Sequence, residues 1–237
     1  MCFKNNDFSN LEIKNIKGKE IYIVDDHNCV FPIWLHKSRE NNVSYRLITF
    51  DYHTDTQPAF LQYSSRVVGN DGMDDKINRA RNIRDEIENE IERSTIENVV
   101  DIVNTKLAYD EHIKLAYDLD VISEFHVINC SGEFTDQDGY YYKNKNIHRN
   151  NRLSDRYIRD MNFNIPSTPY ILDFDLDYFN SNASLEPDDK SVISDLIRNC
   201  EFITIAREAH HFDKLKEDDF TAKDAENKLI DLIESVL

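Results

Sequence analysis

The sequence predicts an α/β protein of three layers, in which helices cover both faces of a mostly parallel sheet. Two observations lead to this prediction. Apolar runs of four to six residues, the length of a buried strand, alternate along the chain with amphipathic segments of helical periodicity. The chain has 237 residues, a length typical of one domain of this class. We therefore expect residues 1–237 to form a single domain.

Five apolar runs have the composition of buried strands, and each is followed by polar or charged residues. They lie in the stretches EIYIVDDHN (20–28), YRLITFDYHTD (45–55), EFHVINCSGE (124–133), TPYILDFDLDYF (168–179) and CEFITIAREAHHFD (200–213). Because both faces of a parallel sheet are buried, its strands are near-continuous apolar runs of this kind.

Four stretches between or after these runs have the spacing of amphipathic helices. They cover residues 74–92, 97–117 (as one or two helices), 188–199 and 222–237. The segment 139–156, GYYYKNKNIHRNNRLSDR, is polar and rich in tyrosine, and we expect a surface loop there.

The composition excludes several classes of function. Apolar residues make up 40% of the chain, which is enough for a sizeable core. The 28 basic and 45 acidic residues give a net charge of −17, which repels nucleic acid and anionic membranes. There is no apolar run long enough to span a membrane, no apolar segment typical of a signal peptide, and no G-x-G-x-x-G or Walker loop. The four scattered cysteines predict free thiols, and we expect a cytoplasmic protein.

Acidic residues and histidines gather where three of the predicted strands end. Side chains alternate along a strand, so residues spaced two apart, such as Asp51, His53 and Asp55, share one face. The same holds for Asp173, Asp175 and Asp177. In open α/β sheets ligands bind outside the carboxyl ends of the strands. We therefore expect one cluster made of Asp26, His27, Asp51, His53, Asp55, Asp173, Asp175 and Asp177.

So many carboxylates repel one another unless some are protonated or cations bind between them. The set is rich in oxygen, includes imidazoles and lacks a thiolate, which suits Mn²⁺ or a similar ion better than structural zinc. It offers about the number of ligands that two ions ~3.5–4 Å apart require. One D-x-H-x-D triplet is weak evidence, since such triplets occur in loops and helix caps, but three clusters at strand ends are specific. We expect His36, His126 and His148 to be surface or core histidines.

Three segments resemble the metal motifs of the ureohydrolase superfamily, which contains arginases and agmatinases. VDDHN (24–28), FDYHTD (50–55) and DFDLDYF (173–179) are similar to the family's G-G-D-H-S, D-A-H-x-D and S-x-D-x-D, in the same chain order. AREAHHF (206–212) is similar to a later R-E-G segment. The most similar branch is the arginase-like group that includes peptide arginases.

The resemblance implies an arginase-like fold and two Mn²⁺ ions per chain. It implies that His27 binds the first metal, His53 the second, and that Asp51, Asp55, Asp175 and Asp177 complete the pair. Asp26 would orient His27 from outside the ligand set. Glu208 matches the glutamate that holds the substrate guanidinium, Asp55 would move a proton to the leaving amine, and His112 is the candidate proton shuttle.

The implied function is hydrolysis of a guanidinium group, converting arginine within a peptide to ornithine and urea. A peptide is favoured over free arginine because the family's segments for the free amino acid are not recognisable in this chain. Two alternatives stay open: a deacetylase-like amidohydrolase that uses one zinc ion, and a non-catalytic interaction module stabilised by metal. For Glu208 the alternative is a surface salt bridge with Arg207 or Lys214.

Overall fold

A computed structural model describes residues 8–69, 73–130, 135, 137–143 and 152–237. Seven strands form one sheet in the order β1-β2-β7-β6-β3-β4-β5, and only the β1–β2 pair is antiparallel within the described part of the chain. The strands are β1 Glu12–Ile16, β2 Lys19–Val24, β3 Tyr45–Asp51, β4 Ile122–Asn129, β5 Tyr140–Lys143, β6 Tyr170–Asp175 and β7 Ile203–Ala206.

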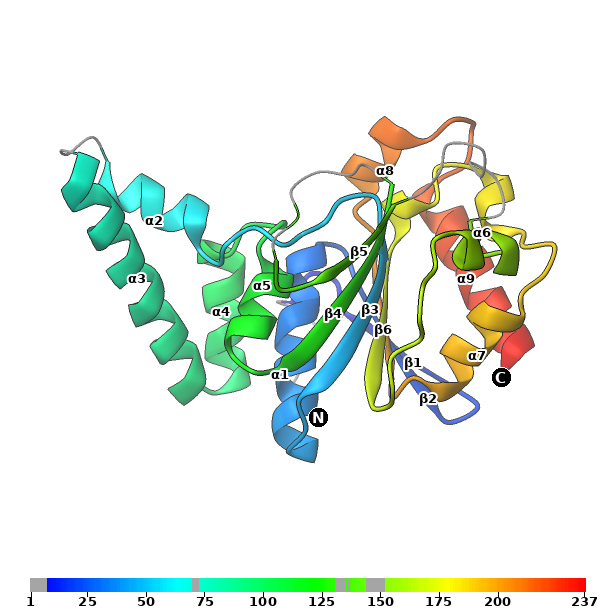
Figure 1. Cartoon of the computed structure of the whole chain (residues 1–237), viewed down its shortest axis with the longest axis horizontal. Coiled ribbons are helices and arrows are strands. Elements are labelled where there is room, and N and C mark those ends of the chain that lie inside the picture. The colour runs from blue at the N-terminus through cyan, green and yellow to red at the C-terminus, as the bar shows by residue number, and fades with distance from the viewer. Residues whose placement is uncertain (1–7, 70–72, 131–134, 136, 144–151) are drawn as a thin grey trace.

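Helices cover both faces of this sheet (Figure 1). One face carries α1 Val30–Asn41, α4 Ile96–Lys106 and α5 His112–Asp118, with α2 Leu61–Val68 and α3 Met73–Arg93 further out. The other carries α6 Asp155–Asp160, α7 Ser191–Asn199 and α9 Ala222–Val236. The short helix α8 Ala209–Leu215 follows β7 directly. The three-layer prediction and the mostly parallel sheet are thus confirmed.

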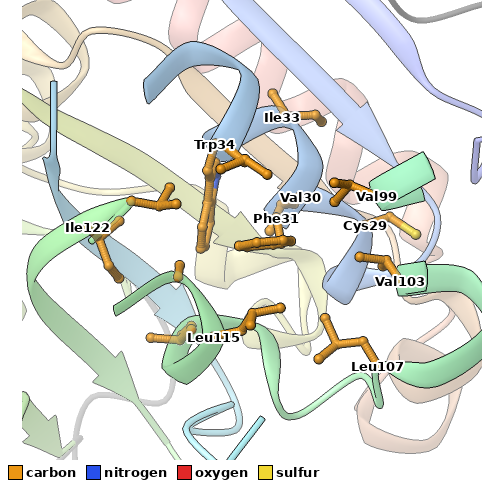
Figure 2. Close-up of a cluster of buried hydrophobic side chains, with 14 of the residues drawn as sticks. Cys29, Val30, Phe31, Ile33, Trp34, Val99, Val103, Leu107, Leu115 and Ile122 are labelled. Atoms are coloured by element: carbon orange, nitrogen blue, oxygen red, sulfur yellow. The ribbon is translucent and has the colours of Figure 1, made fainter. Parts of the chain in front are cut away.

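Two cores lie on opposite faces of the sheet because strand side chains alternate. In β3, Leu47 packs into the core beneath α1, α4 and α5, whereas Ile48 and Phe50 pack into the core beneath α6, α7 and α9. The first core is built around Trp34 and Phe31 of α1, both fully buried (Figure 2).

The five predicted strands correspond to β2, β3, β4, β6 and β7, and the two strands missed are the sheet edges, β1 and β5. β5 falls in the segment 139–156 that we expected to be a loop. Its residues pair in parallel with His126–Asn129 of β4. This edge strand consists of half-exposed tyrosines and a lysine, so it lacks the apolar run by which the other strands were predicted. Residues 144–151 of that segment lie outside the described residues.

The stretch 97–117 forms two helices, α4 and α5. The unpredicted helix α1 is buried continuously from Val30 to Leu35, so it lacks the amphipathic spacing by which the others were found. No helix in the described ranges has the length and hydropathy needed to cross a membrane. The described cysteines, Cys29, Cys130 and Cys200, are free thiols as predicted, and Cys2 lies outside the described residues.

The order of the strands determines where the site lies. β6 pairs with β3 on one side and with β7 on the other, and β7 pairs with β2. All these pairs are parallel, so the carboxyl ends of four neighbouring strands meet at one edge of the sheet. Three of the predicted acid and histidine clusters, and the segment with Glu208, follow these four strands.

Candidate metal centre

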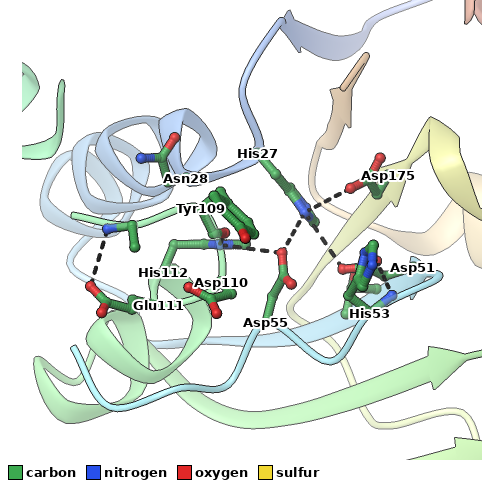
Figure 3. A network of polar contacts seen from close by, with 12 residues as sticks. His27, Asn28, Asp51, His53, Asp55, Tyr109, Asp110, Glu111, His112 and Asp175 are labelled. Carbon is green, nitrogen blue, oxygen red and sulfur yellow. Dashed lines mark hydrogen bonds and ion pairs between the residues drawn. The ribbon is translucent and has the colours of Figure 1, made fainter. Parts of the chain in front are cut away.

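The structure brings all six predicted metal ligands together at this edge. Figure 3 shows His27, Asp51, His53, Asp55 and Asp175 of this set. His27 begins a short 3₁₀ helix after β2, and its Nδ1 lies 3.0 Å from Asp55 Oδ2, 3.2 Å from Asp175 Oδ2 and 3.5 Å from Asp51 Oδ2. Asp51 and Asp175 are the last residues of β3 and β6, so the rigid sheet holds both. One imidazole nitrogen thus faces three carboxylates from two other segments of the chain.

A second imidazole lies on the other side of Asp51. Nδ1 of His53 is 3.1 Å from Asp177 Oδ2 and 3.9 Å from Asp51 Oδ1. Asp51 therefore turns one oxygen toward His27 and the other toward His53. A carboxylate placed in this way can bridge two metal ions.

Several buried polar atoms in this cluster lack a hydrogen bond within the described chain. They include Nδ1 of His27, Oδ2 of Asp51 and Oδ2 of Asp177, on side chains that are fully buried. Buried polar atoms are normally hydrogen-bonded. Unpaired atoms that converge from different strands are the arrangement expected of cation ligands, so these residues fit a metal site. Four carboxylates, two imidazoles and no thiolate suit a hard or borderline divalent ion.

Burial and mutual repulsion change the protonation of the metal-free cluster. Burial, together with the neighbouring carboxylates, raises the pKa values of Asp51 and Asp175 well above their ordinary range. For His27, burial opposes the charged form, but the carboxylates of Asp173 and Asp175 outweigh it and raise the pKa well above its usual value. Without a cation, His27 therefore keeps its proton at neutral pH, and the pKa values of the two carboxyl groups are shifted in the same direction.

Asp173 holds the His27 ring in place. Its Oδ2 lies 2.9 Å from His27 Nε2 and accepts a hydrogen bond of 2.8 Å from the Thr49 hydroxyl. Its Oδ1 accepts from the Thr204 hydroxyl, which in turn accepts from Nε1 of Trp34. Since the carboxylate accepts at Nε2, the other ring nitrogen, Nδ1, is left to face the cluster.

The sequence assigned this orienting role to Asp26, and the structure places Asp26 elsewhere. Asp26 is exposed, and its carboxylate accepts a hydrogen bond of 3.3 Å from the Ser9 hydroxyl. The chain turns away from the sheet after β2, so that His27 points inward and Asp26 outward. Asp173 lies on the same face of β6 as Asp175, and its carboxylate contacts the His27 ring at Nε2.

His112, the candidate proton shuttle, lies beside the cluster as the first residue of α5. Its ring centroid is 4.3 Å from that of His27, and its Nδ1 is 3.0 Å from the Tyr109 carbonyl oxygen and 3.8 Å from Asp55 Oδ2. A carbonyl only accepts, so Nδ1 carries the proton and the buried Nε2 keeps its lone pair. Burial lowers the pKa of His112 well below its usual value, which keeps the ring neutral.

Glu111, which sequence analysis missed, fixes the loop that carries His112. Its buried carboxylate accepts hydrogen bonds from the backbone N–H groups of Gln62, at 2.9 Å, and Ala108, at 3.1 Å. It thereby ties the segment after Asp55 to the start of α5. No signal in the sequence distinguishes it from an ordinary acid before a helix.

Glu208 stands at the start of α8 in a left-handed backbone conformation, with φ 36° and ψ 46°. Its Oε1 accepts a hydrogen bond of 3.2 Å from the His27 backbone N–H, and its Oε2 lies 2.7 Å from Nδ1 of His211. Burial raises its pKa. Glu208 does not form the alternative salt bridge with Arg207, because that guanidinium pairs with Glu12, Asp25 and Glu226 instead.

Two cavities lead from the cluster to solvent. One, of about 350 Å³, is lined by His53, Thr54, Asp55, Gln57, Tyr109, Asp110, His211, Lys214 and Leu215. The other, of about 390 Å³, is lined by Asp25, Asp26, Tyr109, Glu208, Ala209, His210 and His211. Tyr109 and His211 line both cavities, which therefore adjoin. Because His53 and Asp55 line the first and Glu208 lines the second, these side chains are open to a small molecule.

The chain was compared with protein families, curated proteins and solved structures. No protein-family model and no curated protein matches the chain. A crystal structure of a hypothetical agmatinase from Burkholderia thailandensis superposes with a TM-score of 0.49 and 15% sequence identity, over 90% of this chain and 57% of that one. The chain thus spans little more than half the length of that structure. At this score and identity, the likeness does not assign the chain to a family.

We predict that Asp173→Asn weakens Mn²⁺ binding by about 10- to 100-fold, the range typical of groups that orient a metal-bound histidine. The amide keeps the size of the side chain but cannot accept hydrogen bonds with both of its polar atoms. Calorimetric titration with Mn²⁺ measures the change. The matched control is Asp26→Asn, which should bind as the wild type does, and the opposite ranking would return the orienting role to Asp26.

We also predict that metal binding near pH 7 releases protons. The raised pKa values of His27, Asp51 and Asp175 mean that the metal-free folded protein retains protons there, and a cation must displace them. Affinity should therefore increase as the pH rises through this range. Titrations in two buffers of different ionisation enthalpy detect the release, and an identical apparent enthalpy in both would contradict the prediction.

Proposed function

We propose that this protein is a metal-dependent hydrolase of guanidinium groups, of the ureohydrolase type, which converts arginine within a peptide to ornithine and urea. The observation that carries the proposal is the position of Asp51 between two imidazoles, His27 and His53, with a separate carboxylate, Glu208, at the mouth of the same cluster. A purely structural metal site requires neither a bridging arrangement nor an open cavity.

The metal pair would be held by His27 with Asp55 on one side, by His53 with Asp177 on the other, and by Asp51 and Asp175 between them. Two bound divalent ions would supply a nucleophilic water at neutral pH and neutralise charge that develops in the reaction. The oxygen-rich ligand set favours Mn²⁺ as the ion.

Glu208 is the proposed anchor for the guanidinium. Its carboxylate lies at the junction of the cluster and the second cavity, and the backbone N–H of His27 holds one of its oxygens. A carboxylate can bind a planar guanidinium through paired, charge-assisted hydrogen bonds. Holding the group here orients its carbon toward the space between the histidines.

Asp55 and His112 are the proposed path for the proton. Asp55 is buried but lines the first cavity, so its carboxylate contacts both the cluster and an incoming molecule. His112 lies behind it, with a neutral ring whose Nδ1 is fixed by the Tyr109 carbonyl. Asp55 would accept the proton and pass it to the leaving amine, and His112, whose Nδ1 lies 3.8 Å from Asp55 Oδ2, is the proposed shuttle beside it.

The charges of the cavities support a cationic substrate without a free carboxylate. Asp25, Asp26 and Asp110 line the two openings, and Lys214 is the one lysine or arginine among the residues that line them. A carboxylate on the substrate would be repelled by these acids, whereas a peptide bond carries no charge. This favours peptidyl arginine over free arginine.

Mass spectrometry of arginine-containing peptides incubated with Mn²⁺-loaded protein tests the proposal. We expect a loss of about 42 mass units at arginine, the difference between arginine and ornithine residues, with a matching release of urea. Free arginine and agmatine at equal concentration are the controls for substrate class. A protein that binds one ion and deacylates lysine supports the deacetylase-like alternative, and one that binds metal without turnover of any substrate supports the interaction module.

Glu208→Gln separates substrate binding from metal binding. The amide keeps the size and loses the charge, so we predict near-normal metal content with turnover lower by about 10²-fold or more, because the reacting carbon is no longer held in place. Elemental analysis and urea release measure the two effects. Loss of metal would make Glu208 a ligand, and unchanged turnover would place the guanidinium anchor elsewhere.

A further inference from the structure

His211 lies at the metal cluster, yet neither the six predicted ligands nor the proposed reaction uses it. It is in the first turn of α8, three residues after Glu208. Its ring centroid is 5.8 Å from that of His53 and 5.2 Å from that of Tyr109, which packs edge-on against it. His211 lines both cavities, so it stands where the cluster opens to solvent.

His211 lies close to His53 and Asp177, the two residues of the second metal position. Ligand atoms of His53, Asp177 and His211 all lie within 4.8 Å of one another. Asp177 is fully buried, and its Oδ2, which lies 3.1 Å from His53 Nδ1, has no hydrogen bond within the described residues. An unpaired, fully buried carboxylate oxygen that faces two imidazoles is unfavourable without a cation.

The contact between His211 and Glu208 does not satisfy the ring. Nδ1 of His211 is 2.7 Å from Glu208 Oε2, but the alignment is not that of a hydrogen bond, and this buried nitrogen has no hydrogen bond in the part of the chain described. His27 Nδ1 shows the same combination, with close carboxylates and no hydrogen bond. The nitrogen of His211 is therefore in the same state as that of a predicted ligand.

We propose that His211 is a third imidazole ligand, which completes the second metal position together with His53 and Asp177. Asp51 and Asp175 would be shared between the two positions, and the second position would face the cavities that His53 and His211 line. This inference rests on the metal pair of the proposed function and not on its substrate.

The extra imidazole makes the two metal positions chemically different. The first has one histidine among the carboxylates of Asp51, Asp55 and Asp175, a set that suits Mn²⁺. The second has two histidines, and imidazole ligands favour borderline ions such as Zn²⁺ or Fe²⁺. The second position should therefore prefer a borderline ion over Mn²⁺, whereas the first accepts Mn²⁺.

His211→Ala tests the proposal by counting metal ions. Titration with Mn²⁺ and with Zn²⁺ should show two sites in the wild type. In the variant one site should remain unchanged and the other should weaken by at least about 10²-fold, more strongly for Zn²⁺. The spin-coupled electron paramagnetic resonance signal of a Mn²⁺ pair should be replaced by that of single ions. His211→Gln, which keeps a polar side chain of similar size, should show the same loss.

The matched control is His210→Ala. His210 is the neighbouring exposed histidine, it lines only the second cavity, and its ring centroid is 5.8 Å from that of His211. The His210→Ala variant should retain both metal sites. Two sites of wild-type affinity in both His211 variants would overturn the inference and leave the proposed function standing, with His211 reduced to orienting Glu208. A wild type that binds no pair of ions would overturn both.

Discussion

The convergence of buried carboxylates on two imidazoles is the constraint on which the rest of this site depends. Asp51, Asp175 and Asp177 are fully or almost fully buried, and an oxygen of each lies between 3.1 and 3.5 Å from Nδ1 of His27 or His53. Two of their oxygens, Oδ2 of Asp51 and Oδ2 of Asp177, find no hydrogen-bond partner in the described chain. Such a cluster costs stability when it is charged and unscreened. The sheet nevertheless imposes it, because parallel strands in the order β7-β6-β3 end side by side. In the metal-free state, retained protons lower the repulsion between these carboxylates, and a bound cation would remove it.

A second network fixes the position of Glu208 relative to this cluster. The Arg207 guanidinium joins three separate parts of the chain, through Glu12 of β1, Asp25 after β2 and the buried Glu226 of α9. The backbone N–H of Glu208 also donates to the Asp25 carbonyl, at 2.9 Å. These bonds hold the turn between β7 and α8, in which Glu208 adopts a left-handed conformation that a residue with a side chain rarely takes. The backbone of Glu208 is thus held in place by the ion pairs of its neighbour, Arg207.

The sequence predicted the parts of the site that follow directly from strand ends. His27, Asp51, His53, Asp55, Asp175 and Asp177 could be found because an apolar run stops and polar residues begin at each of these places. Asp173 could not be assigned its role, since only the register that places it between Thr49 and Thr204 reveals which ring it supports. The edge strands β1 and β5 and the wholly buried helix α1 lack the periodicity on which such predictions depend.

The short helix α8 would join metal selection to substrate binding. Glu208 precedes its first turn and His211 lies within that turn, and the two side chains are in contact, with Oε2 2.7 Å from Nδ1. Tyr109 contacts His211 from the loop that also carries His112, which connects this helix to the proposed path of the proton. If His211 binds the second ion, a change of ion would act on the same turn that positions Glu208, the proposed guanidinium anchor. The choice of the second metal and the position of the substrate would then both depend on how the chain turns from β7 into α8.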